Sequence, residues 1–384
     1  MNSRLKVVLW CLVTVGFIFG YAGLILPGQT AILEAPRSGV FQYQRLHIFL
    51  FNLVTGGTVL LYFLEGKREL SWRVWVYLAA SLAFSIVAFL NRYLPAILLA
   101  VLLAVIVESV RIERFTFLPV DFFKPSVPVS RKFQHAAVLC LSIGLLICAA
   151  VMLDNQYLHF LNLPLLLLDD FFLGFSFPIS LITFGVMFSL INEKPRGVTW
   201  LLREASFWIV TVGVIIFFVF IVLGVMAAEL ISAIVLLLDV ILIFYLFRTD
   251  LKNLDEPGEF LVSGMIFLIL TGVTGLLLVL WNILTPNDPK GRELLLQTHA
   301  YLSLYGWNLS GLTVLVHYRE FPLHLNELEV ILLHWVTVVL LAPLGSLYPI
   351  FAVAAIPAFA LLTGLVFLKP PERIGTQTPS GAVG

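Results

Sequence analysis

Four side chains combine a chemically useful residue type with a position inside an apolar segment. They are His47, His299, Tyr301 and Asp239. Imidazole and phenol groups can ligate haem iron, and a carboxyl group inside a membrane span can carry a proton or contact a substrate. What each group can do depends on the depth at which its helix holds it.

Membrane-spanning helices are the elements that must position these side chains. Hydrophobic residues make up 60% of the 384-residue chain and charged residues 12%, and the mean hydropathy is +1.01. Soluble proteins carry about one quarter charged residues. Apolar runs repeatedly reach the roughly 20 residues that a transmembrane helix needs, and alternating barrel-type strands are absent. We therefore predict an all-α membrane protein. Its zero net charge gives no indication of a nucleic-acid partner.

The apolar runs divide into twelve predicted spans. Their residues are 7–26, 46–64, 73–90, 93–110, 134–153, 170–191, 206–226, 230–247, 260–284, 294–316, 327–343 and 348–368. The run from 206 to 247 is too long for one helix, so we place a break at Ala227-Ala228-Glu229. The spans form one domain, residues 1–368. The Pro, Gly, Ser and Thr content of residues 369–384 predicts a disordered cytoplasmic tail.

The Lys and Arg residues give the orientation. When the loops are assigned to alternate sides, one side receives only five of the 23 basic residues, namely Arg37, Arg45, Arg92, Lys290 and Arg292. Cytoplasmic loops are the basic ones in multi-pass proteins. We therefore expect both termini in the cytoplasm of a cell whose inner membrane holds the protein.

Only His47 and His299 then combine a helical position with the outer half of the bilayer. His299 and Tyr301 are separated by about 200° around one helix, so their rings leave opposite faces and can address two pockets. A lone histidine in a bundle is also often a hydrogen-bonded structural residue. Asp239 lies near the middle of span eight. It could serve proton or substrate passage, or it could be a neutral group bonded to a hydroxyl of another helix.

Two segments carry a family resemblance. Span two reads FQYQRLHIFLFN, and span ten reads THAYLSLYGWNLSGLTVLVHYREFP. They resemble the corresponding helices of haem-copper oxidase catalytic subunits, and most of all the C-type oxidases and nitric oxide reductases. In that family an Arg-Leu-containing approach precedes a histidine in helix two, and helix ten bears His-x-His, then Gly-Trp, a Tyr and a Pro. The resemblance implies a twelve-transmembrane-helix bundle like haem-copper oxidase subunit I.

The resemblance also implies roles for the site residues. His47 matches one axial ligand of the low-spin haem, and His299 matches the axial ligand of the active-site haem. Tyr301 stands where the family has the second low-spin ligand, although a phenol is a poor partner for low-spin iron. The family's copper ligands are histidines of helices six and seven, yet residues 160–298 contain no histidine. We therefore expect no copper, no dioxygen reduction and one haem at most.

The expected function is a non-catalytic or single-haem component of a respiratory or electron-transfer assembly. Its partners would be the lipid bilayer and other respiratory or cytochrome subunits. Two alternatives remain open. One is a haem-binding membrane protein of the nitric-oxide-response type, and the other is a twelve-helix transporter that uses Asp239.

Overall fold

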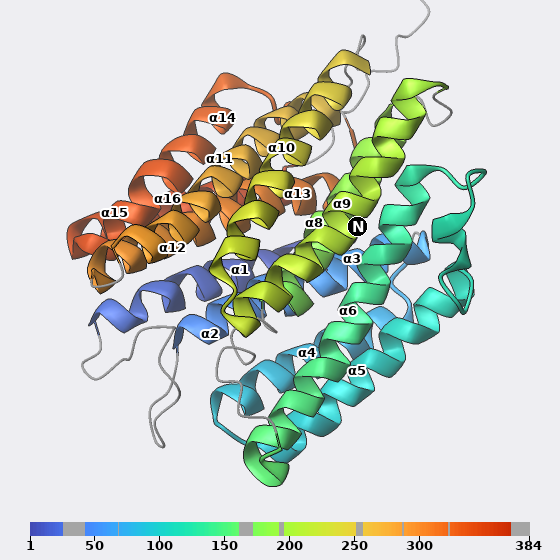
Figure 1. The fold of residues 1–384 in the computed structure, drawn as a ribbon. Helices are drawn as coiled ribbons and strands as arrows, with labels where there is room; N and C mark the ends of the chain where they lie inside the picture. Colours follow the sequence, from blue (N-terminus) through green and yellow to red (C-terminus); the bar gives the residue numbers. More distant parts are fainter. Residues whose placement is uncertain are drawn as a thin grey trace, which may run out of the picture.

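The computed structural model describes residues 1–25, 43–67, 69–160, 172–191, 196–250, 256–285, 288–321 and 323–369. Within these ranges the chain forms helices and no strands, and the helices lie side by side in one bundle (Figure 1). Ten of the described helices are long and apolar enough to cross a membrane. An all-α, multi-pass membrane architecture is therefore confirmed.

Within the described residues, twelve continuous helical segments correspond to the twelve predicted spans. In chain order they are α1 (Ser3–Ile25); α2 (Tyr43–Ile48) with η1 (Phe49–Gly56) and α3 (Gly57–Glu65); α4 (Trp72–Phe89); α5 (Tyr93–Arg114); α6 (Val129–Leu153) with η3 (Asp154–Leu158); η4 (Phe172–Ser176) with α8 (Phe177–Leu190); α9 (Val198–Leu223); α10 (Met226–Asp250); α11 (Glu256–Leu284); α12 (Pro289–Tyr301) with η5 (Leu302–Asn308) and α13 (Leu309–Val316); α14 (Leu328–Trp335) with η6 (Val336–Leu341) and α15 (Ala342–Leu347); and α16 (Pro349–Leu368). A short 3₁₀ turn, η2 (Val120–Phe123), lies in the loop before α6. Of the predicted tail, only Lys369 belongs to the described residues.

The break inside the long apolar run differs slightly from the prediction. Helix α9 ends at Leu223, and Gly224 adopts a left-handed backbone with φ of 68°. The amide of Val225 then donates to the Phe220 carbonyl oxygen at 3.0 Å, which closes a Schellman-type C-cap. The turn therefore falls at Gly224, before the predicted Ala227-Ala228-Glu229, because glycine adopts this conformation without a Cβ penalty.

Contacts between helix ends gather the basic residues at one end of the bundle. Five contacts join spans there: Lys6 with Glu320, Arg73 with Glu65, Arg131 with the Arg114 carbonyl, Lys132 with Glu204, and Lys369 with Glu327. Every basic residue in this set was assigned to the cytoplasmic side. We call this the basic end; its cytoplasmic location remains a prediction from the positive-inside rule.

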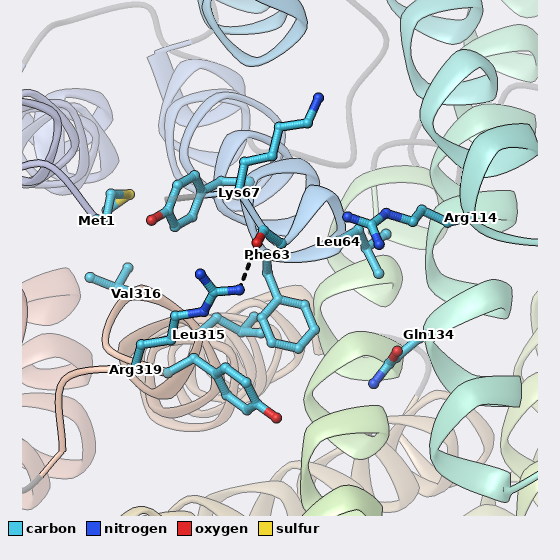
Figure 2. A pocket seen from close by; sticks show the side chains of 12 residues that line it. Met1, Phe63, Leu64, Lys67, Arg114, Gln134, Leu315, Val316 and Arg319 are labelled. Carbon is cyan, nitrogen blue, oxygen red and sulfur yellow. Dashed lines mark hydrogen bonds between the residues drawn. The ribbon is translucent and has the colours of Figure 1, made fainter. Parts of the chain in front are cut away.

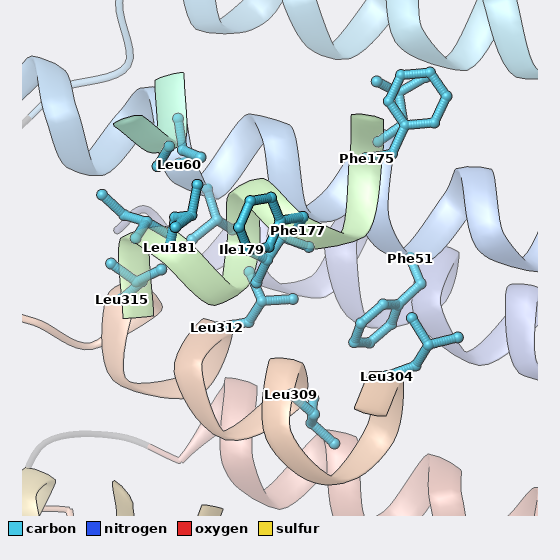
Figure 3. Close-up of a cluster of buried hydrophobic side chains, with 14 of the residues drawn as sticks. Phe51, Leu60, Phe175, Phe177, Ile179, Leu181, Leu304, Leu309, Leu312 and Leu315 are labelled. Atoms are coloured by element: carbon cyan, nitrogen blue, oxygen red, sulfur yellow. The ribbon is translucent and has the colours of Figure 1, made fainter. Parts of the chain in front are cut away.

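A fully buried part of the core lies where spans two, six and ten meet. Leu60 of α3, Ile179 of α8 and Leu312 of α13 are at most 1% exposed and belong to one cluster (Figure 3). Span ten is therefore anchored to spans two and six along the half that approaches the basic end.

Gly144 of α6, in span five, lies directly against the backbone of span six. A Cβ atom at this position would lie 2.4 Å from the Cα of Gly174, which belongs to η4, and 2.9 Å from the Gly174 carbonyl oxygen. Because backbone atoms cannot rotate away, we expect Gly144→Ala to destabilise the protein by about 3 kcal/mol. Thermal unfolding in detergent measures this loss. The control is Gly364→Ala, whose Cβ would meet only ordinary contacts, the nearest at 3.5 Å from Trp10 Nε1. Equal melting temperatures for the two variants would contradict the prediction.

Candidate functional site: His299 on span ten

The ring of His299 is held by α11. Its Nδ1 lies 3.0 Å from the carbonyl oxygen of Thr271 and 3.3 Å from Oγ1 of Thr274. A carbonyl oxygen can only accept, so Nδ1 carries the proton, and Nε2 keeps a lone pair. Gly275 gives the ring its clearance, because a Cβ there would lie 3.1 Å from His299 Cε1. His299 lies on α12, and Asp288 is the N-cap of this helix. The Asp288 side chain accepts a hydrogen bond from the Gly291 amide at 3.1 Å.

Packing around span ten changes sharply at Tyr301. None of residues 290–300 is buried, whereas every residue from 304 to 316 is buried. His299 therefore lies on the half of its helix whose side chains are not fully buried, and none of the described residues forms a hydrogen bond with its Nε2.

Tyr301 leaves the helix on another side, as the angular separation predicts. Its hydroxyl lies 2.9 Å from Oγ of Ser346 in α15, and its ring lies 6.3 Å from that of Tyr21 in α1. The ring of Tyr305 follows at 5.9 Å. Tyr301 thus belongs to an aromatic cluster shared by spans one and ten, and its hydroxyl contacts span eleven.

His47 reaches the opposite side of the same aromatic cluster. Its ring lies against Gly20 of α1, and its centroid is 6.3 Å from that of Tyr305. Tyr305 is 1% exposed, and three further rings surround it at 4.8 to 5.2 Å, namely those of Phe17, Phe51 and Phe359. A low-spin haem would have to occupy the space that these rings fill. The residues around His47 and Tyr301 therefore do not fit a haem between them.

Asp239 has a partner on the neighbouring helix. It is 4% exposed on α10, and Oγ of Ser206 on α9 donates to its Oδ1 at 2.8 Å. This is the bonded arrangement expected of a structural carboxyl group in a membrane span. The cavity described below does not include Asp239.

Side-chain hydrogen bonds join spans six and ten at a place that the sequence analysis did not predict, and we call this set of bonds the polar seam. Nδ2 of Asn308 donates to Oγ of Ser176 at 2.9 Å, and Ser180 donates to Asn308 Oδ1 at 2.9 Å. The Trp307 indole donates to Ser180 Oγ at 3.0 Å. Two serines four residues apart share one face of a helix, which is the signal that could have indicated this seam. Where the resemblance would place copper ligands, the described part of span six thus offers hydroxyl groups.

The seam predicts a cost for removing its central amide. Asn308→Ala deletes the side-chain hydrogen bonds that join span ten to Ser176 and Ser180 of span six. Interhelical hydrogen bonds in membranes contribute about 0.6 to 1.7 kcal/mol each. We expect a loss of roughly 1–2 kcal/mol in unfolding free energy, measured by denaturation in mixed micelles. Ser189→Ala is the control, since Ser189 Oγ donates only to the Val186 carbonyl of its own helix. An unchanged Asn308→Ala variant would show that the seam does not stabilise the bundle.

The described residues contain no group of three or more His, Cys, Asp or Glu side chains that could hold a metal ion. No protein-family model matches the chain, and the comparisons with curated proteins and with solved structures gave no match. The case for function therefore depends on the surroundings of His299.

Proposed function

We propose that the chain is a membrane-embedded component of an electron-transfer assembly that binds one haem through His299 and does not reduce dioxygen. The observation that carries the proposal is the Nδ1 contact of His299 with the Thr271 carbonyl oxygen at 3.0 Å. Histidines that ligate metals commonly donate their other ring N–H to a backbone carbonyl, which fixes the tautomer and the ring orientation.

Two further features support a haem at this position. None of residues 290–300 is fully buried, unlike the side chains that fill the space beside His47. Arg292 lies seven residues before His299, so both residues fall on one stripe of the helix, about 10 Å apart. A guanidinium there can pair with the carboxylate groups of a haem. The residues of this region therefore fit the cofactor.

The protein's own groups have defined roles in this proposal. Thr271 and Thr274 hold the imidazole, Gly275 gives it space, and Nε2 is the ligating atom. A bound haem supplies one-electron redox chemistry. The sequence offers no histidine from residue 160 to 298, so spans six and seven supply no imidazole for copper. Electron transfer to partner cytochrome or respiratory subunits then suits the chain better than oxygen reduction.

A transporter that uses Asp239 receives less support from the geometry. The carboxyl group bonds to Ser206 between α9 and α10, and it does not line the cavity at the basic end of the bundle. No observation at Asp239 therefore favours a transport path over a structural hydrogen bond.

The proposal is tested on protein purified in detergent from cells supplied with haem precursor. We expect a Soret band that shifts on dithionite reduction, together with no oxygen consumption when a reduced cytochrome is added. A colourless protein would refute haem binding. Rapid oxygen consumption by the purified chain would refute the non-oxidase assignment.

A further inference from the structure

A cavity of about 260 Å³ opens at the basic end of the bundle. It lies among the ends of α3, α5 and α13, beside α6 (Figure 2). Apolar side chains such as Phe63, Leu64 and Leu315 form part of its wall, and the hydroxyl-bearing Tyr62 and Tyr318 also line it. None of the residues that line the cavity belongs to the His299 site.

Three cations line this cavity, and each comes from a different connection. Lys67 follows α3, Arg114 ends α5, and Arg319 follows α13. Both guanidinium groups reach Gly66. A Cβ there would lie 3.2 Å from Nη2 of Arg114 and 3.7 Å from Nη2 of Arg319.

Gly66 shapes the floor of the cavity. It caps α3 with a left-handed backbone, φ 62°, and its carbonyl oxygen accepts a hydrogen bond from Arg319 Nη2 at 2.6 Å. Figure 2 shows this bond as a dashed line, with Arg114 on the other side of the α3 terminus. The bond holds Arg319 in place, whereas none of the described residues forms an ion pair with Arg114 or Lys67.

Three carboxylates that adjoin lining residues in the sequence are bound to other cations. Glu65 lies 2.9 Å from Nε of Arg73, and Glu113 also pairs with Arg73. Glu320 binds Lys6, the Nδ1 atom of His317 at 2.8 Å and the Met1 amine at 2.8 Å. Burial raises the pKa of Glu320, but these hydrogen bonds outweigh burial and hold its pKa well below the usual range. Glu320 therefore stays ionised and bound to Lys6, His317 and the Met1 amine.

We propose that this cavity binds the phosphate group of an anion, from either a phospholipid headgroup or free phosphate. Guanidinium groups suit phosphate oxygens because they offer paired N–H donors, and Lys67 adds a third positive charge. Basic pockets between helices at the cytoplasmic side of membrane proteins are suited to anionic headgroups. The apolar wall beside the cations favours a ligand that also carries an acyl or glycerol portion. This inference is independent of the proposed haem.

The test uses the full chain in neutral detergent with two probes. Inorganic phosphate is titrated by calorimetry, and short-chain phosphatidylglycerol is compared with phosphatidylcholine by native mass spectrometry. We expect saturable binding of at least one phosphate probe, weakened at least tenfold by Arg114→Gln and by Lys67→Gln. Phosphatidylglycerol binding without phosphate binding assigns the site to a headgroup, and phosphate binding that displaces the lipid assigns it to free anions.

The matched control is Arg4→Gln, which removes one exposed charge outside the cavity lining. It should leave the affinity unchanged. Lys67 is exposed, so its variant keeps the test valid if Arg114→Gln impairs folding. Failure of both probes to bind the unaltered chain would overturn the proposal. An equal loss in Arg4→Gln and in the two cavity variants would also overturn it, because the binding would then be nonspecific.

Discussion

His299→Ala should abolish the haem absorbance, whereas His47→Ala should leave it in place. The reason is geometric. His299 has a fixed tautomer and lies on the half of its helix whose side chains are not fully buried, while the rings around Tyr305 fill the space beside His47. Spectra of the two variants, normalised to protein content, measure the difference directly. A band that disappears with His47→Ala instead would place the haem on the opposite side of span ten.

Loss of the band could also follow from misfolding, so the variant needs a rescue. Imidazole added during purification of His299→Ala can occupy the space left by the side chain and offer a nitrogen to the iron. We expect the band to return partly under these conditions. The melting temperature of the variant provides a second check, because His299 is only partly buried and its removal should cost little stability.

Lys132→Met should produce a large loss of stability. Nζ of Lys132 lies 2.7 Å from Oε2 of Glu204, and the two residues are 1% and 9% exposed. Removing the cation leaves a buried carboxylate without its cationic partner, which costs about 3–5 kcal/mol in comparable pairs. Thermal or denaturant unfolding in detergent measures the loss.

The double variant Lys132→Met/Glu204→Leu separates charge burial from packing. Replacing both members of a buried ion pair by apolar residues is often neutral. We therefore expect the double variant to recover most of the stability that Lys132→Met loses. If the double variant is as unstable as the single one, packing at this position matters more than the charge.

The positions of the helices were predictable from the sequence because bilayer thickness imposes a length on each apolar run. Span two was expected at residues 46–64, and the structure has continuous helix from Tyr43 to Glu65. The alternation of basic loops was equally informative, since Lys6, Arg73 and Lys132 make contacts at one end of the bundle. Both signals are local in the chain and require no knowledge of which helices touch.

Contacts between spans were the part that could not be predicted. The separation of His299 and Tyr301 around the helix was computable, yet the sequence does not say which neighbour each ring meets. The packing of Tyr305 beside His47 depends on rings from spans one, two, ten and twelve, and the Ser206 partner of Asp239 depends on how α9 and α10 pack. Such pairings are tertiary and leave no periodic signal in either helix.

Haem stoichiometry tests the central claim most directly. The claim is that one side of span ten accepts a haem at His299, while the side facing His47 is closed by aromatic side chains. A pyridine haemochromogen assay combined with amino-acid quantification gives the number of haems per chain. We predict one. A value near two would contradict the closed aromatic side, and a value near zero in haem-supplied cells would contradict the role of His299.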